Sequence, residues 1–219
     1  MKFSKDEIRR SMLLYAVTDR QWLKGEETLA GVCREVLEGG ATFLQIREKD
    51  LDPGAFSREA RELKALCAAY HVPFVVNDSV EIALEIDADG VHVGQSDIRG
   101  RDIRAMLGPD RILGISAGTV EEAIAAEQAG ADYIGVGAVF GTSTKRDARN
   151  LSTEELRRIS GAVEIPVVAI GGINAENLSR LSGCGVDGVA VVSAIFGAER
   201  PGEAAAMLLK LARDMTAHG

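Results

Sequence analysis

The stretch Ala131-Asp132-Tyr133-Ile134-Gly135-Val136 has two close counterparts elsewhere in the chain. They are Ala88-Asp89-Gly90-Val91-His92-Val93 and Val186-Asp187-Gly188-Val189-Ala190-Val191. Each stretch reads as the end of a helix followed by a short apolar run of the kind that forms a buried strand. The pattern therefore predicts a repeated helix-to-strand unit.

Further apolar runs extend this repeat along all 219 residues. The eight predicted strands are Met12–Val17, Phe43–Ile46, Phe74–Val76, Val91–Val93, Ile112–Ile115, Tyr133–Val136, Val167–Ile170 and Val189–Val192. Helical periodicity is found at Glu26–Glu38, Ala55–Tyr70, Val120–Ala129 and Thr153–Ile159, and Gly202–Met215 reads as a closing helix. Near-continuous apolar strands that alternate with helices indicate a parallel sheet covered by helices.

Two α/β architectures fit such an alternation, a closed barrel and a doubly wound open sheet. Eight evenly spaced units, without a G-x-G-x-x-G turn after the first strand, favour the barrel. We therefore expect a single (βα)8 TIM barrel domain over residues 1–219, with its active site at the carboxyl ends of the strands.

Composition limits the classes of partner. The formal net charge of −8 argues against a nucleic-acid or anionic-membrane partner. Cys33, Cys67 and Cys184 lack metal-type spacing, and Cys33 and Cys67, which fall in helical patterns, are expected to be buried thiols in a reducing compartment. Neither an apolar leader nor a run of membrane-spanning length is present, so a cytoplasmic location is expected.

The second predicted strand leads into Gln45-Ile46-Arg47-Glu48-Lys49. Side chains alternate along a strand, so Gln45, Arg47 and Lys49 are predicted to share one face, opposite Leu44 and Ile46. Two cations on one face repel each other unless an anion lies between them. This strand end therefore predicts a polyanionic ligand, whereas Glu48 is expected to form a structural ion pair or cap.

Polar residues follow the other strands as well. Asn77 and Asp78 follow the third predicted strand, and Asp97 follows the fourth. For each aspartate a helix N-cap or first-turn position is one interpretation. The other is a Mg²⁺ site, because Mg²⁺ takes one or two carboxylates and completes its shell with water and phosphate oxygens. The sequence alone leaves both interpretations open.

The ends of the seventh and eighth strands contain Gly171-Gly172 and Ser193. Glycines let backbone N–H groups approach a phosphate, and a short extra helix after the eighth strand is a recurring part of barrel phosphate sites. The alternative is a tight turn before a helix capped by Asn174. The position in a barrel favours phosphate binding.

The sixth strand leads into a loop with Thr142-Ser143-Thr144-Lys145, which lacks the glycine that a Walker A motif places before its lysine. It is interpreted either as a lid over phosphates or as a solvated surface loop. His92, inside the fourth strand, is expected to be a packed, hydrogen-bonded barrel residue. Asp19 has no assigned role.

Taken in order, these motifs resemble the thiamine phosphate synthase family over nearly the whole chain. The matching pieces are Tyr15-Ala16-Val17-Thr18-Asp19, Gln45-Ile46-Arg47-Glu48-Lys49, Asn77-Asp78, His92-Val93-Gly94-Gln95-Ser96-Asp97, Gly114-Ile115-Ser116, Thr142-Ser143-Thr144-Lys145 with Asp147, Gly171-Gly172-Ile173 and Val192-Ser193-Ala194-Ile195. Ala138 and Gly141 stand where family members often carry proline.

The resemblance implies a transferase that expels pyrophosphate from 4-amino-2-methyl-5-hydroxymethylpyrimidine diphosphate, giving a cation that the nitrogen of a thiazole phosphate, or of its carboxylated form, captures. It implies that the diphosphate substrate is bound by Gln45, Ile46, Arg47, Glu48, Lys49, Asn77, Ser116 and Lys145. Of these, Arg47, Lys49, Ser116 and Lys145 would be catalytic. The thiazole phosphate would contact Thr142, Ser143, Thr144, Gly172, Val192 and Ser193.

The same resemblance implies one Mg²⁺ per subunit, held by Asp78 and Asp97, and leaves open a homo-oligomer. Two alternatives are a thiazole tautomerase-like isomerase and a non-catalytic phosphate-binding regulator on the same fold. The presence of Arg47, Lys49 and Lys145 together with both aspartates argues against each of them.

Overall fold

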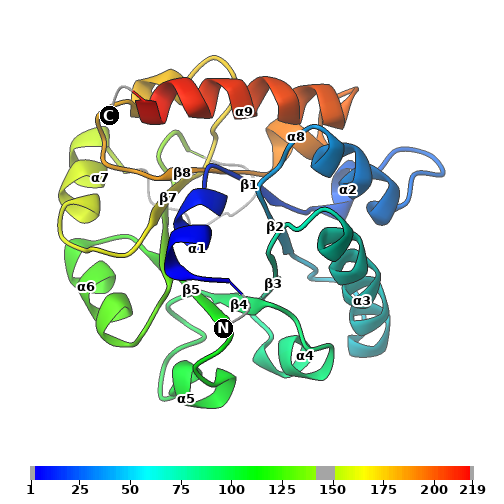
Figure 1. The fold of residues 1–219 in the computed structure, drawn as a ribbon, viewed down its shortest axis with the longest axis horizontal. Helices are drawn as coiled ribbons and strands as arrows, with labels where there is room; N and C mark the ends of the chain where they lie inside the picture. The colour runs from blue at the N-terminus through cyan, green and yellow to red at the C-terminus, as the bar shows by residue number, and fades with distance from the viewer. Residues whose placement is uncertain (1–2, 142–150, 218–219) are drawn as a thin grey trace.

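The eight strands of the protein close into a parallel barrel in which each strand is hydrogen-bonded to the next and β8 to β1. The structure is a computed structural model that describes residues 3–141 and 151–217. The strands are β1 (Leu14–Val17), β2 (Phe43–Ile46), β3 (Phe74–Asn77), β4 (Gly90–Val93), β5 (Ile112–Ala117), β6 (Tyr133–Gly137), β7 (Val167–Ile170) and β8 (Gly188–Val191). Figure 1 shows the helices arranged around this ring, which confirms the predicted (βα)8 barrel.

Five helices correspond to the predicted ones with small shifts at their ends. They are α2 (Leu29–Glu38), α3 (Pro53–Ala69), α6 (Val120–Gln128), α7 (Thr153–Ser160) and α9 (Pro201–Ala217). The short helix after the eighth strand is α8 (Ser193–Phe196), and single 3-10 turns form η1 (Arg20–Trp22) and η2 (Leu178–Leu181).

Three short helices were not predicted: α1 (Lys5–Ser11), α4 (Val80–Glu85) and α5 (Ile103–Leu107). Each has two turns or fewer, which is too short to establish a helical period. Their starts are instead fixed by capping side chains, Ser4, Ser79 and Asp102 respectively.

Strand alternation divides the buried side chains into two layers. Outward-facing residues such as Leu44 and Ile46 pack against the helices, as predicted. Inward-facing residues such as Tyr15 and Tyr133 form a separate cluster with Ile8 and Met12, which come from and just after α1. In Figure 1, α1 lies across the near end of the barrel. The apolar side chains around α1 thus close the amino end, so a ligand can approach the interior from the carboxyl ends of the strands.

A repeated polar contact fixes the amino end of the strands. The residue immediately before each even-numbered strand accepts a hydrogen bond from a backbone N–H at the start of the preceding odd-numbered strand. The pairs are Thr42 Oγ1 with Leu14 at 2.8 Å, Asp89 with Phe74 at 3.0 Å, Asp132 with Leu113 at 2.8 Å and Asp187 with Val167 at 2.8 Å. The aspartate of the recurring sequence motif is therefore a strand cap.

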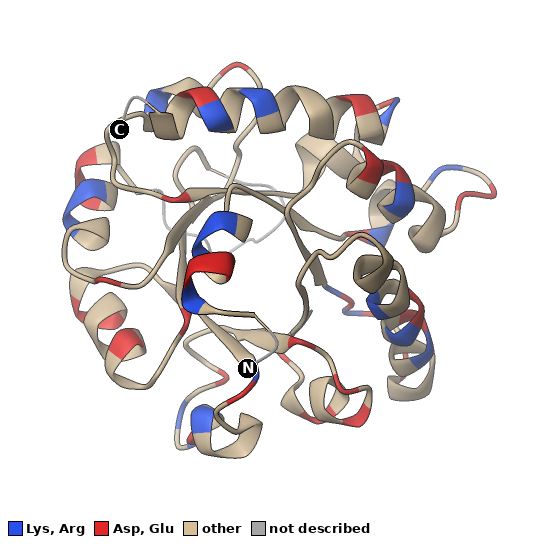
Figure 2. Ribbon diagram, in the orientation of Figure 1, with Lys and Arg blue, Asp and Glu red and all other residues tan. Residues whose placement is uncertain are grey.

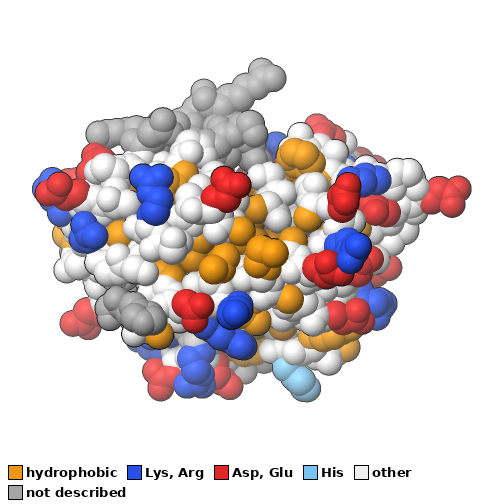
Figure 3. Space-filling view, turned by 90° about the horizontal axis from the view of Figure 1, so that it is seen from above, with side chains coloured by type: hydrophobic (Ala, Val, Ile, Leu, Met, Phe, Trp, Pro, Cys, Tyr) orange, Lys and Arg blue, Asp and Glu red, His pale blue; other side chains and the backbone are white. Residues whose placement is uncertain are grey.

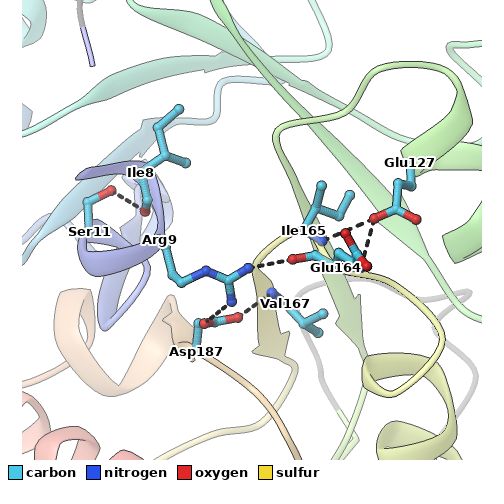
Figure 4. A network of polar contacts seen from close by, with 8 residues as sticks. All are labelled: Ile8, Arg9, Ser11, Glu127, Glu164, Ile165, Val167 and Asp187. Atoms are coloured by element: carbon cyan, nitrogen blue, oxygen red, sulfur yellow. Dashed lines mark hydrogen bonds and ion pairs between the residues drawn. The ribbon is translucent and has the colours of Figure 1, made fainter. Parts of the chain in front are cut away.

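Arginines anchor two of these caps. Asp132 pairs with Arg104 at 2.7 Å, and Asp187 pairs with Arg9 of α1 at 2.6 Å. Figure 4 shows that Arg9 also reaches the backbone carbonyl of Glu164, at 2.5 Å. The helix that closes the amino end is thus tied to the rim by the same aspartate that caps β7.

The outer surface carries both signs of charge, interspersed on the helices around the ring (Figure 2). The face covered by α9 has apolar side chains near its middle with charged groups around them (Figure 3). On α9, Met207 is 57% exposed. Within the described ranges, no helix has the length and apolar character needed to cross a membrane.

We expect Asp132→Ala to lower the free energy of unfolding by about 2 kcal/mol, because it leaves the buried Leu113 N–H without its acceptor. Asp132→Asn keeps an acceptor oxygen and loses only the charge, so its loss should be clearly smaller. Urea unfolding of both variants checks this. Equal losses in the two variants would contradict the capping role.

Candidate active site

Gln45 is the innermost polar residue of the predicted anion site. Its side chain lies in the barrel interior with only 4% of the residue exposed, and its amide Nε2 is buried without a hydrogen-bond partner among the described residues. A buried donor without a partner is costly, so such a group in a binding mouth is suited to a ligand acceptor.

Arg47 lies just beyond the end of β2 and is held from two sides. Its backbone N–H donates to Thr18 Oγ1 at 2.9 Å, and its Nη1 lies 3.8 Å from Asp19 Oδ2. Asp19, which the sequence left unassigned, also caps η1 by accepting from the Gln21 N–H at 3.2 Å. The guanidinium is therefore positioned beside the mouth by residues that follow β1.

Lys49 lies in the loop that follows β2, three residues beyond the end of the strand. Because β2 ends at Ile46, strand alternation reaches neither Arg47 nor Lys49, so the predicted reason for their sharing a face with Gln45 is wrong. Lys49 is exposed in the loop and still lines a cavity of about 270 Å³ beside Arg47. The residues lining that cavity are Asp19, Arg20, Gln21, Arg47, Glu48, Lys49 and Asp50.

Glu48 forms the ion pair that the sequence suggested. Its Oε2 accepts from Arg20 Nε at 2.6 Å, and Arg20 also reaches Glu59 at 2.6 Å. Burial raises the pKa of Glu48, and the Arg20 contact opposes that shift. The Glu48 side chain thus serves the loop that presents Arg47, and a direct contact of Glu48 with substrate stays a prediction.

Asp78 and Asp97 are neighbours, and neither caps a helix. The N-cap of α4 is Ser79, and that of α5 is Asp102. Asp78 adopts a positive φ of 63°, while Asp97 Oδ2 accepts from the Gly94 N–H at 2.8 Å. The helix-cap interpretation is therefore wrong for both residues.

The electrostatics of the pair favour a cation. Partial loss of hydration raises the pKa of the Asp78 carboxyl, and the adjacent Asp97 raises it further, whereas Arg47 lowers it. Two carboxylates at adjacent strand ends have the donor chemistry of a Mg²⁺ site. In the described ranges no cluster of three or more His, Cys, Asp or Glu side chains is arranged for a metal, so water or substrate oxygens would complete the shell.

Ser116 belongs to a polar chain inside the barrel. Its Oγ lies 2.9 Å from His92 Nε2, and its backbone carbonyl accepts from Gln95 Nε2 at 2.7 Å. His92 Nδ1 lies 3.0 Å from the Tyr133 hydroxyl, which confirms His92 as a hydrogen-bonded barrel residue. The parts played by Gln95 and Tyr133 were not predicted from the sequence. For Tyr133 a signal was available in the sequence, because strand alternation points its side chain into the barrel.

Directly after β7, Gly171 and Gly172 have φ values of +105° and +65°. A Cβ added at Gly172 would lie 2.1 Å from the Gly141 carbonyl oxygen, so the backbone here requires glycine. Asn174 caps the following turn by accepting from the backbone N–H groups of Glu176 and Asn177 at 2.9 and 3.2 Å. The glycines therefore form a tight turn, but the helix that follows is the 3-10 turn η2, whose N-cap is Asn177 and not the expected Asn174.

The remaining predicted contacts near this turn are Val192, which is partly buried, and Ser193, which is exposed at the first position of α8. Both lie at the carboxyl ends of the strands, as does Asn77 at the end of β3. Phosphate binding at Gly172, Val192 and Ser193 stays a prediction. Thr142, Ser143, Thr144 and Lys145 lie outside the described residues.

Comparisons with known proteins find similarity over most of the chain. A family model described as thiamine monophosphate synthase matches residues 14–195. A thiamine-phosphate synthase of Alkaliphilus oremlandii is 49% identical over 195 residues, which cover 89% of this chain and 93% of the relative. One of Ruminiclostridium cellulolyticum is 48% identical over 198 residues, covering 90% and 94%.

A solved structure is similar as well. Thiamine phosphate pyrophosphorylase from Pyrococcus furiosus superposes with a TM-score of 0.87 at 40% identity, covering 95% of this chain and 98% of that one. The matched family model spans the barrel strands and the mouth residues described above. Together these similarities show that the chain belongs to the thiamine monophosphate synthase family.

Proposed function

We propose that the mouth of this barrel joins 4-amino-2-methyl-5-hydroxymethylpyrimidine diphosphate to a thiazole phosphate, giving thiamine phosphate and pyrophosphate. The observation that carries the proposal is the meeting of opposite charges at the carboxyl ends of β2, β3 and β4. Arg47 lies close enough to the Asp78–Asp97 pair to lower the pKa of Asp78. Such a site suits a polyanion bound together with a divalent cation.

The diphosphate would be bound on the β2 side of the mouth. The cavity of about 270 Å³ opens there, next to the charges of Arg47 and Lys49. The buried Gln45 amide lacks an acceptor and is suited to a substrate oxygen or ring nitrogen. The proposed contacts are Gln45, Arg47, Glu48, Lys49, Asn77, Ser116 and Lys145, with Ile46 contributing through its backbone because its side chain packs against the helices.

Asp78 and Asp97 would hold one Mg²⁺, since the pair concentrates negative charge. Among the described residues no group of three His, Cys, Asp or Glu side chains is arranged for a metal, so the two aspartates would be the protein's ligands. When bound, Mg²⁺ would supply charge neutralisation to the diphosphate oxygens. Arg47 and Lys49 would contribute to the same neutralisation from the β2 side. The thiazole phosphate would lie across the mouth, against Thr142, Ser143, Thr144, Gly172, Val192 and Ser193.

The chemistry requires positioning and charge stabilisation more than a nucleophilic side chain. The bond between the pyrimidine methylene carbon and the diphosphate oxygen breaks, and the electron pair leaves on oxygen. The lone pair of the thiazole nitrogen then forms the new carbon–nitrogen bond. Arg47 and Lys49 would stabilise the leaving oxygens, and the phosphate contacts near β7 and β8 would hold the nitrogen near the developing cation.

The two alternative functions are less well supported by the residues in the mouth. A tautomerase-like isomerase would not use a diphosphate, and a non-catalytic regulator would not need the acidic pair. Arg47, Asp78 and Asp97 are present together and interact electrostatically. Preference for the carboxylated thiazole, a homo-oligomeric state and a cytoplasmic location stay predictions from the sequence.

We expect the purified protein to form thiamine phosphate and release pyrophosphate when given both substrates and Mg²⁺. Addition of a chelator should abolish turnover, and excess Mg²⁺ should restore it. A coupled pyrophosphate assay, with the product identified by chromatography, measures both. Absence of Mg²⁺-dependent product would overturn the proposed function.

We expect Asp97→Asn to raise the Mg²⁺ concentration for half-maximal activity by about tenfold or more, a loss typical of damaged metal sites. The asparagine retains an oxygen for the Gly94 N–H, so the loop should stay folded. Asp102→Asn is the matched control, because asparagine is an equally good N-cap and Asp102 caps α5. An identical Mg²⁺ dependence in the two variants would remove Asp97 from the metal site.

A further inference from the structure

Four polar side chains form one hydrogen-bonded chain through the barrel interior. The Tyr15 and Tyr133 hydroxyl oxygens are 2.7 Å apart, Tyr133 is 3.0 Å from His92 Nδ1, and His92 Nε2 is 2.9 Å from Ser116 Oγ. We propose that this chain fixes His92 as its Nε2–H tautomer and thereby makes the Ser116 hydroxyl a hydrogen-bond donor toward the substrate. His92 is then a positioning residue that acts through Ser116.

Tyr15, at the buried end of this hydrogen-bonded chain, determines which group donates and which accepts in the first hydrogen bond. This residue is 2% exposed and belongs to the apolar cluster that contains Ile8 and Met12. Among residues 3–141 and 151–217, the Tyr15 hydroxyl has one hydrogen-bond partner, the Tyr133 hydroxyl. Burial raises the pKa of both tyrosines, so both hydroxyls keep their hydrogens. If Tyr15 accepted from Tyr133, its own hydrogen would be left unsatisfied in an apolar interior. Tyr15 therefore donates to Tyr133.

The next link determines the histidine tautomer. Because the Tyr133 oxygen accepts from Tyr15, its hydrogen is left for His92 Nδ1. A nitrogen that accepts cannot carry a hydrogen, so in the neutral ring the hydrogen lies on Nε2. Gly114 makes this contact sterically feasible. A Cβ there would lie 2.2 Å from Tyr133 Cζ and 2.6 Å from His92 Nδ1.

The last hydrogen bond, between His92 and Ser116, determines whether the Ser116 hydroxyl donates to or accepts from a substrate. His92 Nε2–H donates to Ser116 Oγ, which leaves the hydroxyl hydrogen for an acceptor in the mouth. Gln95 holds the Ser116 backbone carbonyl, so the residue is fixed on two sides. Ser116 would consequently select a substrate group with an available lone pair, such as a ring nitrogen or a phosphate oxygen. The reverse direction would make Ser116 an acceptor and would favour a substrate N–H.

Long-range ¹H–¹⁵N correlation spectra of protein labelled with ¹⁵N-histidine distinguish the two neutral tautomers directly. His92 is assigned by comparison with His92→Gln, which removes its signals and leaves those of His71 and His218. We expect the Nε2–H pattern in the wild-type protein. The Nδ1–H pattern, or a doubly protonated ring, would overturn the proposal without any reference to activity.

Two matched tyrosine variants separate the links. Tyr15→Phe leaves Tyr133 with His92 as its remaining partner, so the Nε2–H tautomer should persist. Tyr133→Phe removes the donor to Nδ1, so the ring should populate both tautomers. An unchanged pure Nε2–H pattern in Tyr133→Phe would show that the chain does not set the tautomer and would contradict the proposal.

The functional consequence rests on the proposed function and is tested by a double-mutant cycle on kcat/KM. Ser116→Ala and Tyr133→Phe should each lower kcat/KM. The double variant should lose no more than Ser116→Ala alone, because Tyr133 and His92 act through Ser116. Multiplicative losses would contradict that coupling. A wild-type protein without synthase activity would instead contradict the proposed function. The tautomer measurement would still test whether the hydrogen-bonded chain fixes His92 as its Nε2–H form.

Discussion

The amino end of the barrel is closed by α1 and by hydrogen bonds between neighbouring strands. Each odd-numbered strand begins with a backbone N–H that needs an acceptor, and the residue before the next strand supplies it. Asp187 extends this arrangement to α1 through Arg9, so the helix that covers the amino end is fixed to the strand rim. With that end closed, polar chemistry is confined to the opposite mouth.

The interior becomes progressively more polar from the closed end to the mouth. Ile8 and Met12 lie at the apolar end, the tyrosine pair lies above them, and His92 leads to Ser116. At the tyrosine end the chain is buried, where hydrogen bonds are strong and an unsatisfied hydroxyl is costly, which gives the chain a defined direction. The same interior that stabilises the barrel can therefore determine the hydrogen-bonding role of a residue in the active site.

The sequence predicted those features that arise from local pattern. The apolar runs of Phe43–Ile46 and Val167–Ile170 coincide with β2 and β7, because a buried parallel strand is marked by its composition. Met12 was assigned to the first strand and instead follows α1, since an apolar residue at a helix end looks the same as one in a strand.

Features that depend on tertiary contacts could not be predicted in this way. An ion pair or cap was predicted for Glu48, but not its partner Arg20, which comes from a different loop. The positive φ of Asp78 is likewise a property of the folded connection. Strand alternation could not place Arg47 or Lys49, because the position where a strand ends is set by pairing with its neighbours, not by its own residues. The Tyr15–Tyr133 contact joins residues separated by 118 positions and has no local signature.

The opposite charges at the mouth are proposed to bind a diphosphate jointly with Mg²⁺. Calorimetric titration with pyrophosphate, at saturating Mg²⁺ and in the presence of a chelator, tests it most directly. We expect Mg²⁺ to strengthen pyrophosphate binding, and we expect this gain to disappear when Asp78 and Asp97 are both changed to asparagine. Equal affinity with and without Mg²⁺, or a gain that survives in the double variant, would contradict it.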